Sequence, residues 1–180
     1  MIHLTEADYR RMPWANGRGT TVEMVRVDKP DGGLLWRLSR ASVVEDGPFS
    51  LFPGLERNLT VISGHGFRLV GPGISLDCRP LVPVAFPGDL PIQAEATGGR
   101  PSDDFNVMTD RSLPLPAVTV VRDGAVLEAG GTLCLFALGA VAVAGVAMAP
   151  HDLLVTDRLA RIEGDAPVIA VRLPGTHPLV

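Results

Sequence analysis

The sequence is poor in the residues on which several classes of protein depend. It has only two cysteines, Cys78 and Cys134, and neither lies in a C-x-x-C or similar metal or redox spacing. Each falls within an apolar or strand-like stretch. We therefore expect two buried free thiols instead of a metal or redox centre.

Positive charge is also scarce. Sixteen lysines and arginines stand against twenty aspartates and glutamates, which gives a formal net charge of −4. Proteins that bind a phosphate backbone normally carry a basic stripe, and the sequence has none. We therefore expect no nucleic-acid partner.

Long uncharged runs are few. One stretch, 133–149, contains no charged residue and falls a little short of the length that spans a membrane. Gly139 and Gly145 divide it into pieces that suit short buried strands, 141–143 and 146–148. Residues 1–8 lack the basic and apolar regions of a secretory signal. These features favour a cytoplasmic protein without a membrane partner.

Windows long enough for a helix are rare, because twenty glycines and sixteen prolines are scattered along the chain. The best helical candidate is short, with Thr5 as its cap, and it ends before Pro13. Short segments of β character follow one another between turn signals, namely 20–27, 35–43, 59–62, 67–70, 84–86, 92–96, 106–108, 118–122, 133–138, 141–143, 153–156, 161–163 and 168–173. Their regular spacing predicts a barrel or jelly roll.

A faint internal repeat points to two such barrels. Residues 59–67 and 133–141 are apolar segments at one fixed offset, and Gly71 and Gly145 keep that offset. A chain that is 46% hydrophobic can bury a core in each half. We therefore expect an N-terminal half over 1–112 and a C-terminal half over 113–180, a division that leaves room for strand exchange between them.

A glycine-rich loop running into a strand is the first candidate for a binding element. It covers 13–23 and contains Asn16, Gly17, Thr21 and Glu23. Glycines there permit close approach of the backbone, and exposed N–H groups can meet an anion. An ordinary turn before a strand explains the same residues.

The next segment alternates in the manner of a strand. Trp36 and Leu38 share one face, and Arg37, Ser39 and Ala41 share the other. If the polar set points into a barrel, Arg37 and Ser39 form a pair of donors in a concave site. If it points outward, they form a solvated edge. A loop over 46–54 follows, and its two phenylalanines are expected to fill the core.

Arginines recur further along the chain. Arg57 opens a strand, and a dense polar cluster over 103–111 contains Asn106 and Arg111. A guanidinium group fits a carboxylate in two parallel hydrogen bonds, so Arg37, Arg57 and Arg111 suit acidic ligands. The competing interpretation is that these arginines pair with acids of the chain itself, with Asp46, Glu56, Asp104 and Asp110 as the candidates.

Motifs for metal binding and covalent catalysis are missing. Metal-dependent cupins use two histidines one residue apart, a glutamate and a later histidine. Here the four histidines are isolated, and His65 lies in a suitable turn without a second ligand after it. No G-x-S-x-G elbow or recognisable triad occurs. Acid–base catalysis through Glu23 or Asp104 stays open, although pairing with arginine would lower the pKa of either carboxyl.

The order of these motifs resembles that of the HutD/Ves family. The resemblance rests on Pro13-Trp14-x-Asn16-Gly17-x-Gly19-x-Thr21-x-Glu23, Trp36-Arg37-x-Ser39-x-Ala41, Asp46-Gly47-Pro48-Phe49-Ser50, Phe52-Pro53-Gly54-x-x-Arg57 and Asp104-Phe105-Asn106-x-Met108-x-x-Arg111. These motifs cover about the first two-thirds of the chain. Ala15 stands where family members usually have lysine, and Arg18 takes a glycine position, so the charge is moved three residues along.

The resemblance implies an all-β double cupin (bicupin) without the usual metal ligands or a cofactor. It also implies a link to histidine utilisation, which family members are thought to moderate. A ligand of the urocanate or formylglutamate class would suit the arginines and asparagines of this chain. Sheet edges of double cupins are compatible with a homodimer.

The first hypothesis is a non-catalytic regulatory protein that binds a small acidic metabolite. Its expected pocket consists of Asn16, Gly17, Thr21, Glu23, Arg37, Ser39, Arg57, Asn106 and Arg111. The alternative is a metal-free cupin isomerase or lyase with Glu23 or Asp104 as the base. A third hypothesis is a scaffold protein in which the motifs serve folding alone.

Overall fold

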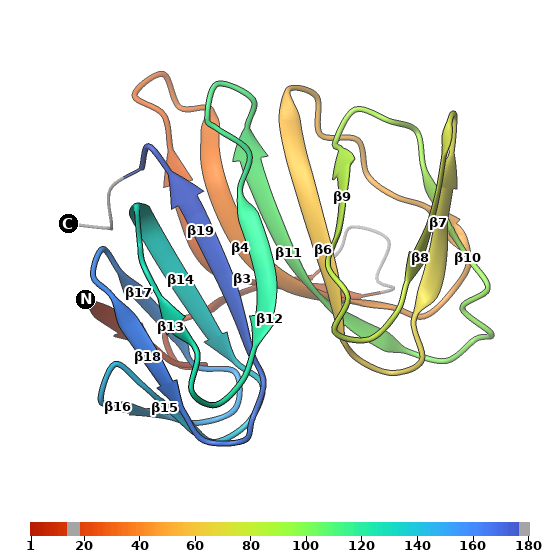
Figure 1. Ribbon diagram of the computed structural model, residues 1–180. Coiled ribbons are helices and arrows are strands. Elements are labelled where there is room, and N and C mark those ends of the chain that lie inside the picture. The colour runs from red at the N-terminus through yellow and green to blue at the C-terminus, as the bar shows by residue number, and fades with distance from the viewer. Residues whose placement is uncertain (14–18, 177–180) are drawn as a thin grey trace. The chain divides into compact units, whose positions relative to one another are not determined.

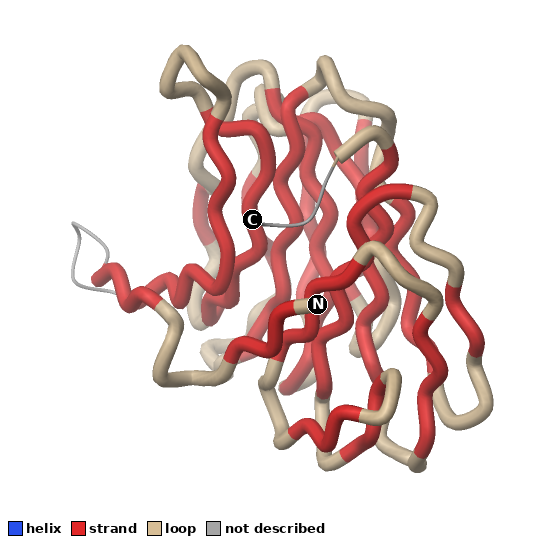
Figure 2. The backbone as a smooth tube through the Cα atoms, turned by 90° about the vertical axis from the view of Figure 1, so that its left-hand side faces the viewer, coloured by secondary structure: helices blue, strands red, loops and turns tan. Residues whose placement is uncertain are grey.

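The computed structural model describes residues 1–13 and 19–176, and this part of the chain consists of strands and loops without a helix (Figure 2). The expectation of an all-β fold is confirmed. No helix in these residues is long and apolar enough to cross a membrane. The apolar stretch 133–149 instead contributes the end of one strand and two short strands, 141–143 and 146–148.

The chain divides into two compact units. The N-terminal unit, Arg10–Arg111, contains a six-stranded sheet in the order β2-β3-β4-β11-β6-β9 and a four-stranded sheet in the order β5-β10-β7-β8 (Figure 1). Its strands are β2 (Arg10–Pro13), β3 (Thr20–Asp28), β4 (Leu34–Val43), β5 (Gly47–Pro48), β6 (Leu55–Ser63), β7 (Phe67–Gly71), β8 (Ile74–Cys78), β9 (Val84–Pro87), β10 (Gln93–Glu95) and β11 (Ser102–Asp110).

The core of the N-terminal unit contains residues from both of its sheets. Leu59 and Val61 of β6 and Phe86 of β9 come from the six-stranded sheet, and Phe67 and Leu69 of β7 come from the four-stranded one. Alternate residues of β6 and β7 enter this core because successive side chains of a strand point to opposite faces. The unit is therefore a β-sandwich with its own hydrophobic interior.

The C-terminal unit comprises Met1–Tyr9 and Ser112–Val180. It contains a five-stranded sheet in the order β1-β17-β14-β19-β12 and a four-stranded sheet in the order β13-β18-β15-β16. Its strands are β1 (Ile2–Leu4), β12 (Ala117–Val121), β13 (Val126–Leu127), β14 (Gly131–Ala137), β15 (Val141–Val143), β16 (Val146–Met148), β17 (Leu153–Thr156), β18 (Ala160–Glu163) and β19 (Val168–Pro174). Leu133, Leu135, Val143, Leu154 and Ile162 lie in its core.

The first nine residues belong to the C-terminal unit, whereas the sequence placed them in a half over 1–112. Strand β1 pairs antiparallel with β17, with His3 opposite Leu154. The His3 imidazole Nε2 lies 2.8 Å from a carboxylate oxygen of Asp152, and the Tyr9 hydroxyl donates to the His151 carbonyl at 2.8 Å. Pairing with β1 satisfies backbone groups that β17 would otherwise leave open at the sheet edge.

The short helix considered at Thr5 is not formed, and that expectation is wrong. Residues 5–8 make one turn, in which the Asp8 N–H donates to the Thr5 carbonyl at 2.9 Å. The Asp8 carboxylate accepts from the Thr5 N–H at 2.8 Å and from its hydroxyl at 3.0 Å. Strand β2 then begins at Arg10, because hydrogen-bonded pairing with β3 stabilises this segment more than an isolated helical turn would.

Both cysteines are buried free thiols, as expected. Burial raises the pKa of Cys78 to about 12 and also raises the pKa of Cys134. Both side chains therefore behave as small apolar groups at neutral pH.

Candidate ligand-binding site in the N-terminal unit

Polar side chains gather on the inner face of the six-stranded sheet. Ser39 of β4 lies directly opposite Glu23 of β3 and Asn106 of β11. One row further, Met108 of β11 lies between Arg37 of β4 and Arg57 of β6. Residues directly opposite one another share a face of the sheet.

Two core residues show that this face is the inner one. Asn106 is opposite Leu59, and Arg57 is opposite Phe86, and both Leu59 and Phe86 lie in the core of the unit. The alternation in 36–41 left the direction open, and the register settles it. Arg37 and Ser39 point inward.

Arg57 is the more enclosed of the two arginines, with 6% of the residue exposed. Its guanidinium carbon lies 5.4, 5.1 and 5.0 Å from the ring centroids of Phe49, Phe52 and Phe86. Nη2 donates to the Asn106 amide oxygen at 3.2 Å, and Nη1 donates to the Ser50 carbonyl at 3.5 Å. Both bonds are long for a charged donor.

Arg37 approaches the same aromatic ring from the neighbouring row. Its guanidinium carbon lies 5.7 Å from the Phe52 centroid. Nη2 contacts the Met108 sulfur at 3.3 Å, and Nη1 lies 3.8 Å from a carboxylate oxygen of Glu23. Two guanidinium groups thus converge on Phe52.

Both arginines retain an unused donor. The Nε atoms of Arg37 and Arg57 are buried and have no hydrogen-bond partner among the residues that the structure describes. Burial lowers the pKa of Arg57 to about 10 and also lowers the pKa of Arg37. Both groups still carry their charge at neutral pH, so the site holds positive charge with unmet hydrogen-bonding capacity.

Asp104 lies on the same face, two residues before Asn106. Its carboxylate accepts a hydrogen bond from the Asn106 amide, and the residue is 1% exposed. Burial raises the pKa of Asp104 to about 7, against the opposing effect of Arg57. Arg57 acts to lower this pKa, as expected of an arginine, but desolvation of a fully buried carboxylate outweighs a cation that does not contact it.

The residues predicted in the glycine-rich loop and the strand after it are only partly described. Thr21 lies two residues before Glu23 on β3 and opposite Met12 of β2, so it shares the face of Glu23. Asn16 and Gly17 lie outside the residues that the structure describes.

Arg111 does not join the site. It follows β11, and its guanidinium makes two hydrogen bonds of 2.7 Å to Asp89 and one of 2.7 Å to Glu56. These carboxylates raise the pKa of Arg111. The placement of Arg111 in the pocket is therefore wrong, since its side chain is exposed and already fully paired with acids of the chain.

Sequence reasoning missed the aromatic part of the site. Phe49 and Phe52 were expected to fill the core. Phe49 does pack against it, and the rings of Phe49 and Phe52 also contact the arginines, as does Phe86. Met108 was named only as part of a motif, yet it separates the two guanidinium groups. The signal that could have found it is the alternation of a strand, which places Met108 on the face of Asn106 two residues before it.

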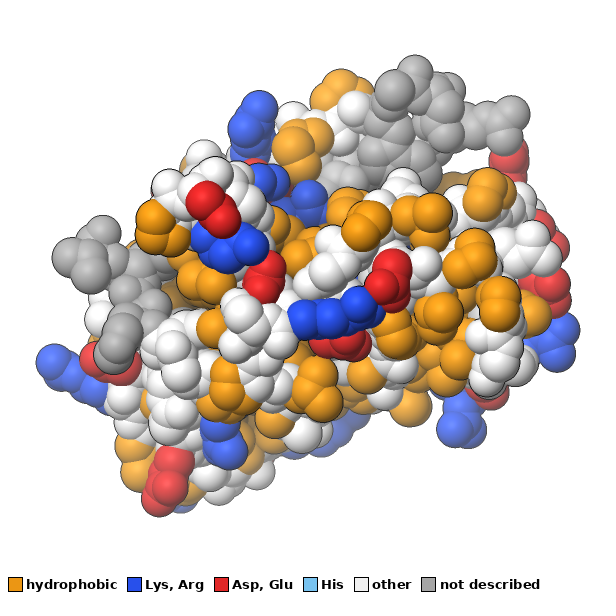
Figure 3. Space-filling model, turned by 90° about the horizontal axis from the view of Figure 1, so that it is seen from above, with side chains coloured by type: hydrophobic (Ala, Val, Ile, Leu, Met, Phe, Trp, Pro, Cys, Tyr) orange, Lys and Arg blue, Asp and Glu red, His pale blue; other side chains and the backbone are white. Residues whose placement is uncertain are grey.

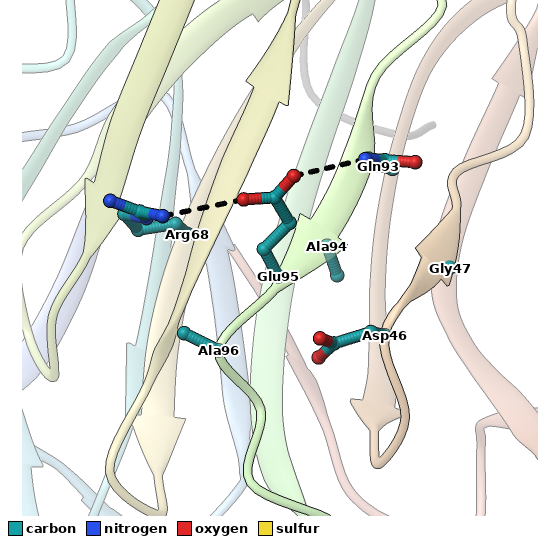
Figure 4. A pocket seen from close by; sticks show the side chains of 7 residues that line it. All are labelled: Asp46, Gly47, Arg68, Gln93, Ala94, Glu95 and Ala96. Carbon is teal, nitrogen blue, oxygen red and sulfur yellow. Dashed lines mark hydrogen bonds and ion pairs between the residues drawn. The ribbon is translucent and has the colours of Figure 1, made fainter.

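A separate open depression lies over the four-stranded sheet of the N-terminal unit. It is lined by Asp46, Gly47, Arg68, Gln93, Ala94, Glu95 and Ala96 (Figure 4). Figure 4 shows the Glu95 carboxylate between Arg68, at 3.3 Å, and Gln93, at 2.9 Å. Asp46 accepts two hydrogen bonds from Thr97. The polar groups of this depression are therefore paired and exposed, and they are weaker candidates for ligand binding than the buried arginines.

The described residues contain no metal cluster, and the face seen in Figure 3 shows no broad basic patch. Within 1–13 and 19–176, no three His, Cys, Asp or Glu side chains are grouped so that they could hold a metal ion. On the face seen in Figure 3, most basic side chains have acidic ones beside them, and apolar side chains lie between these charged groups.

The fold places the protein in a structural class. The fold is that of the all-β cupins, with antiparallel sheets enclosing a core in each unit. It is similar to a cupin 2 conserved barrel domain protein from Leptotrichia buccalis, with a TM-score of 0.57 and 9% identity over 91% of this chain and 96% of that one. A likeness at this level shows the fold alone.

The chain belongs to the HutD family, whose model matches residues 6–172. The structure of HutD from Pseudomonas fluorescens SBW25 is similar, with a TM-score of 0.84 and 31% identity over 97% of this chain and 99% of that one. A Pseudomonas putida protein described as an "uncharacterized 21.2 kDa protein in hutC 3'region" is 43% identical over 110 residues. That match covers 58% of this chain and 56% of the relative. The family is thus linked to the histidine-utilisation locus.

Proposed function

We propose that this chain is a non-catalytic protein that binds a small carboxylate at Arg37 and Arg57 in its N-terminal unit. One observation carries the proposal. Two guanidinium groups, that of the buried Arg57 and that of the partly buried Arg37, contact the same ring, and the buried Nε of each has no hydrogen-bond partner in the described residues. Arginine forks of this kind match the geometry of a carboxylate.

The charge balance of the site supports an anionic ligand. Arg37 and Arg57 contribute two positive charges, and Glu23 lies 3.8 Å from Arg37. Asp104 has a pKa of about 7 and is therefore partly neutral at physiological pH. One carboxylate would complete the neutralisation of the buried cations, which otherwise carry a desolvation cost.

The present partners of Arg57 are replaceable. Its bonds to Ser50 and Asn106 are 3.5 and 3.2 Å long, whereas charge-assisted bonds to a carboxylate are typically about 2.7–2.9 Å. Phe52 is half-buried and Leu51 is exposed, so this loop can move aside at little cost to the core. In this proposal the ligand displaces the loop and takes its place over the guanidinium groups.

The ligand class follows from the family. We infer that acids of histidine breakdown, such as urocanate or formylglutamate, are the natural ligands, and that their binding moderates histidine utilisation. The support is the family membership, the position of the Pseudomonas putida relative in the hutC 3' region, and the two arginines.

Isothermal titration and thermal unfolding with a panel of such acids test the proposal. A ligand at about one hundred times its Kd should stabilise the fold by about 2.7 kcal/mol and raise the Tm by roughly 5–10 °C. Arg57→Gln should abolish the effect, and Arg37→Gln, at a less buried position, should weaken it about tenfold or more. Arg79→Gln serves as the matched control, because Arg79 is exposed in the same unit and pairs with Asp77, which is also exposed.

Two results would overturn this assignment. Unchanged binding by Arg37→Gln and by folded Arg57→Gln would place the site elsewhere. Absence of binding by every acid in the panel would remove the receptor role. Circular dichroism of each variant shows whether a lost signal reflects lost ligand contacts or lost folding.

A metal-free enzyme is the second candidate, and one observation favours it. A carboxyl with a pKa of about 7, as in Asp104, is suited to act as a general base near neutral pH. Its full burial behind Asn106 argues against direct contact with a substrate. Consumption of a bound acid over time, lost in Asp104→Asn, would favour the enzyme over the receptor.

A further inference from the structure

The C-terminal unit contains a recess of its own, separate from the site described above. It opens between β12, β13, β14 and β19 and has a volume of about 80 Å³. Its lining comprises Ala117, Thr119, Leu127, Leu133, Ala170 and Arg172. Five of these six residues are apolar or weakly polar, so the charge of Arg172 stands out.

Arg172 lacks the partners that an arginine in a sheet normally has. Its Nε is buried and makes no hydrogen bond to the described residues, and its guanidinium forms no ion pair with their carboxylates. The residue lies opposite Leu133 of β14 and Ala117 of β12, so it shares the inner face on which Leu133 enters the core. An unpaired buried donor of this kind costs free energy that a bound acceptor would recover.

The internal repeat relates this recess to the site of the N-terminal unit. Strand β14 lies between β19 and β17 as β6 lies between β11 and β9. Leu133 is opposite Arg172 as Leu59 is opposite Asn106, so Arg172 holds the position of Asn106. Gly131 holds the position of Arg57, two residues before the leucine. At these two positions the N-terminal unit therefore has an arginine and an asparagine, and the C-terminal unit has a glycine and an arginine.

The dimensions and chemistry of the recess select its ligand. A recess of about 80 Å³ is small and holds a group of a few non-hydrogen atoms. Arg172 supplies a positive charge, and the Thr119 hydroxyl supplies a second donor. Leu127, Leu133 and Ala170 offer an apolar wall, against which a second carboxylate would be poorly solvated.

We propose that this recess is a second binding site, specific for a small monocarboxylate with a short apolar tail, with the carboxylate on Arg172. The tail lies against Leu127 and Leu133. The site is independent of the arginine pair in the N-terminal unit and takes a smaller ligand than that pair does.

Methyl-resolved NMR titration of the full chain with acetate tests the proposal. The methyl resonances of Leu127 and Leu133 should shift and saturate, while Met108 reports separately on the first site. Arg172→Gln should raise the Kd for these shifts by about tenfold or more. Ala117→Leu should also block them, because it fills the recess from an exposed position where the larger side chain does not threaten folding.

Matched controls separate this site from general anion effects. Arg161→Gln, at an exposed arginine of the same unit, should titrate like the parent chain. Sodium chloride and succinate at equal ionic strength should cause no saturable shift of the Leu127 and Leu133 methyl resonances. Saturable shifts in Arg172→Gln with an unchanged Kd would overturn the proposal, as would equal shifts with chloride or continued binding by Ala117→Leu.

Discussion

Arg37 and Arg57 carry the functional argument at the scale of single residues. Placing a guanidinium group inside a β-sandwich costs several kcal/mol unless its hydrogen bonds are made. Arg57 recovers part of this cost from three aromatic rings and Asn106, and Arg37 recovers part from Phe52 and Glu23. The Nε donors make no hydrogen bond in the described residues, so the share of this cost that belongs to them is recovered only when a ligand binds.

Asp104 should make carboxylate binding depend on pH. Its pKa is about 7 because it is buried, and a bound carboxylate near Arg57 favours the neutral form of Asp104. Affinity should therefore rise by up to about tenfold between about pH 8 and about pH 6. Titration calorimetry across this range measures the effect. In Asp104→Asn the dependence should vanish, and a pH profile that the substitution leaves intact would contradict the role of Asp104.

The same group should also affect stability. Because the pKa of Asp104 is raised from 3.8 to about 7 on folding, the folded state holds this proton more tightly than the unfolded chain does. Its contribution to the free energy of unfolding is therefore fully present below about pH 4, falls as the pH rises and levels off above about pH 7. Asp104→Asn should flatten this part of the stability profile.

Motif order predicted which candidate residues lie together better than it predicted their surroundings. Arg37, Ser39, Arg57 and Asn106 were predicted and lie together on one inner face. The error at Arg111 has a spatial cause, since Asp89 lies 22 positions away along the chain and approaches only after folding. Sequence spacing could not separate a free arginine from one already paired.

At the scale of the elements, alternating hydrophobicity located most of the strands. Strand β8, Ile74–Cys78, was missed even though Ile74, Leu76 and Cys78 alternate with polar residues between turns. Strands β1 and β2 carry no comparable alternation and depend on pairing with β17 and β3. The Thr5 segment shows the same effect, since a local helical signal yields to the ladder that follows it.

The connection between β6 and β7 should be intolerant of side chains. Gly66 has a φ of +87°, and a Cβ there would collide with the Cys78 carbonyl. Gly73, in the turn between β7 and β8, has a φ of +75° with open space around it. Gly73→Ala should cost about 1 kcal/mol of unfolding free energy, and Gly66→Ala roughly 3 kcal/mol, because its backbone must also shift. Urea unfolding of the two variants gives this comparison, and equal losses would mean that the collision is relieved without cost.

The whole molecule is organised by a topology that its sequence does not reveal. The chain begins in one unit, builds the other over Arg10–Arg111 and then returns to finish the first. Segment composition gave no sign of this return, because β1 is three residues long and its partner β17 lies about 150 residues away. The end of the N-terminal unit at Arg111 lies next to the expected boundary, since Ser112 and Pro114 begin a turn-rich segment.

Removal of residues 1–8 should weaken the C-terminal unit. It deletes β1 and the contact of His3 with Asp152, and it leaves β17 as an unpaired edge. Hydrogen exchange followed by mass spectrometry should show the largest increase at β17, Leu153–Thr156. Unchanged exchange there would mean that β1 contributes nothing to the stability of this sheet.

A crystal structure of the chain with the tightest-binding acid of the panel tests the central claim most directly. The account predicts a carboxylate within hydrogen-bond distance of the Arg37 and Arg57 guanidinium groups, with Phe52 moved from its present contact with them. An acid bound in the open depression at Asp46 and Glu95, with Arg37 and Arg57 unchanged, would contradict it.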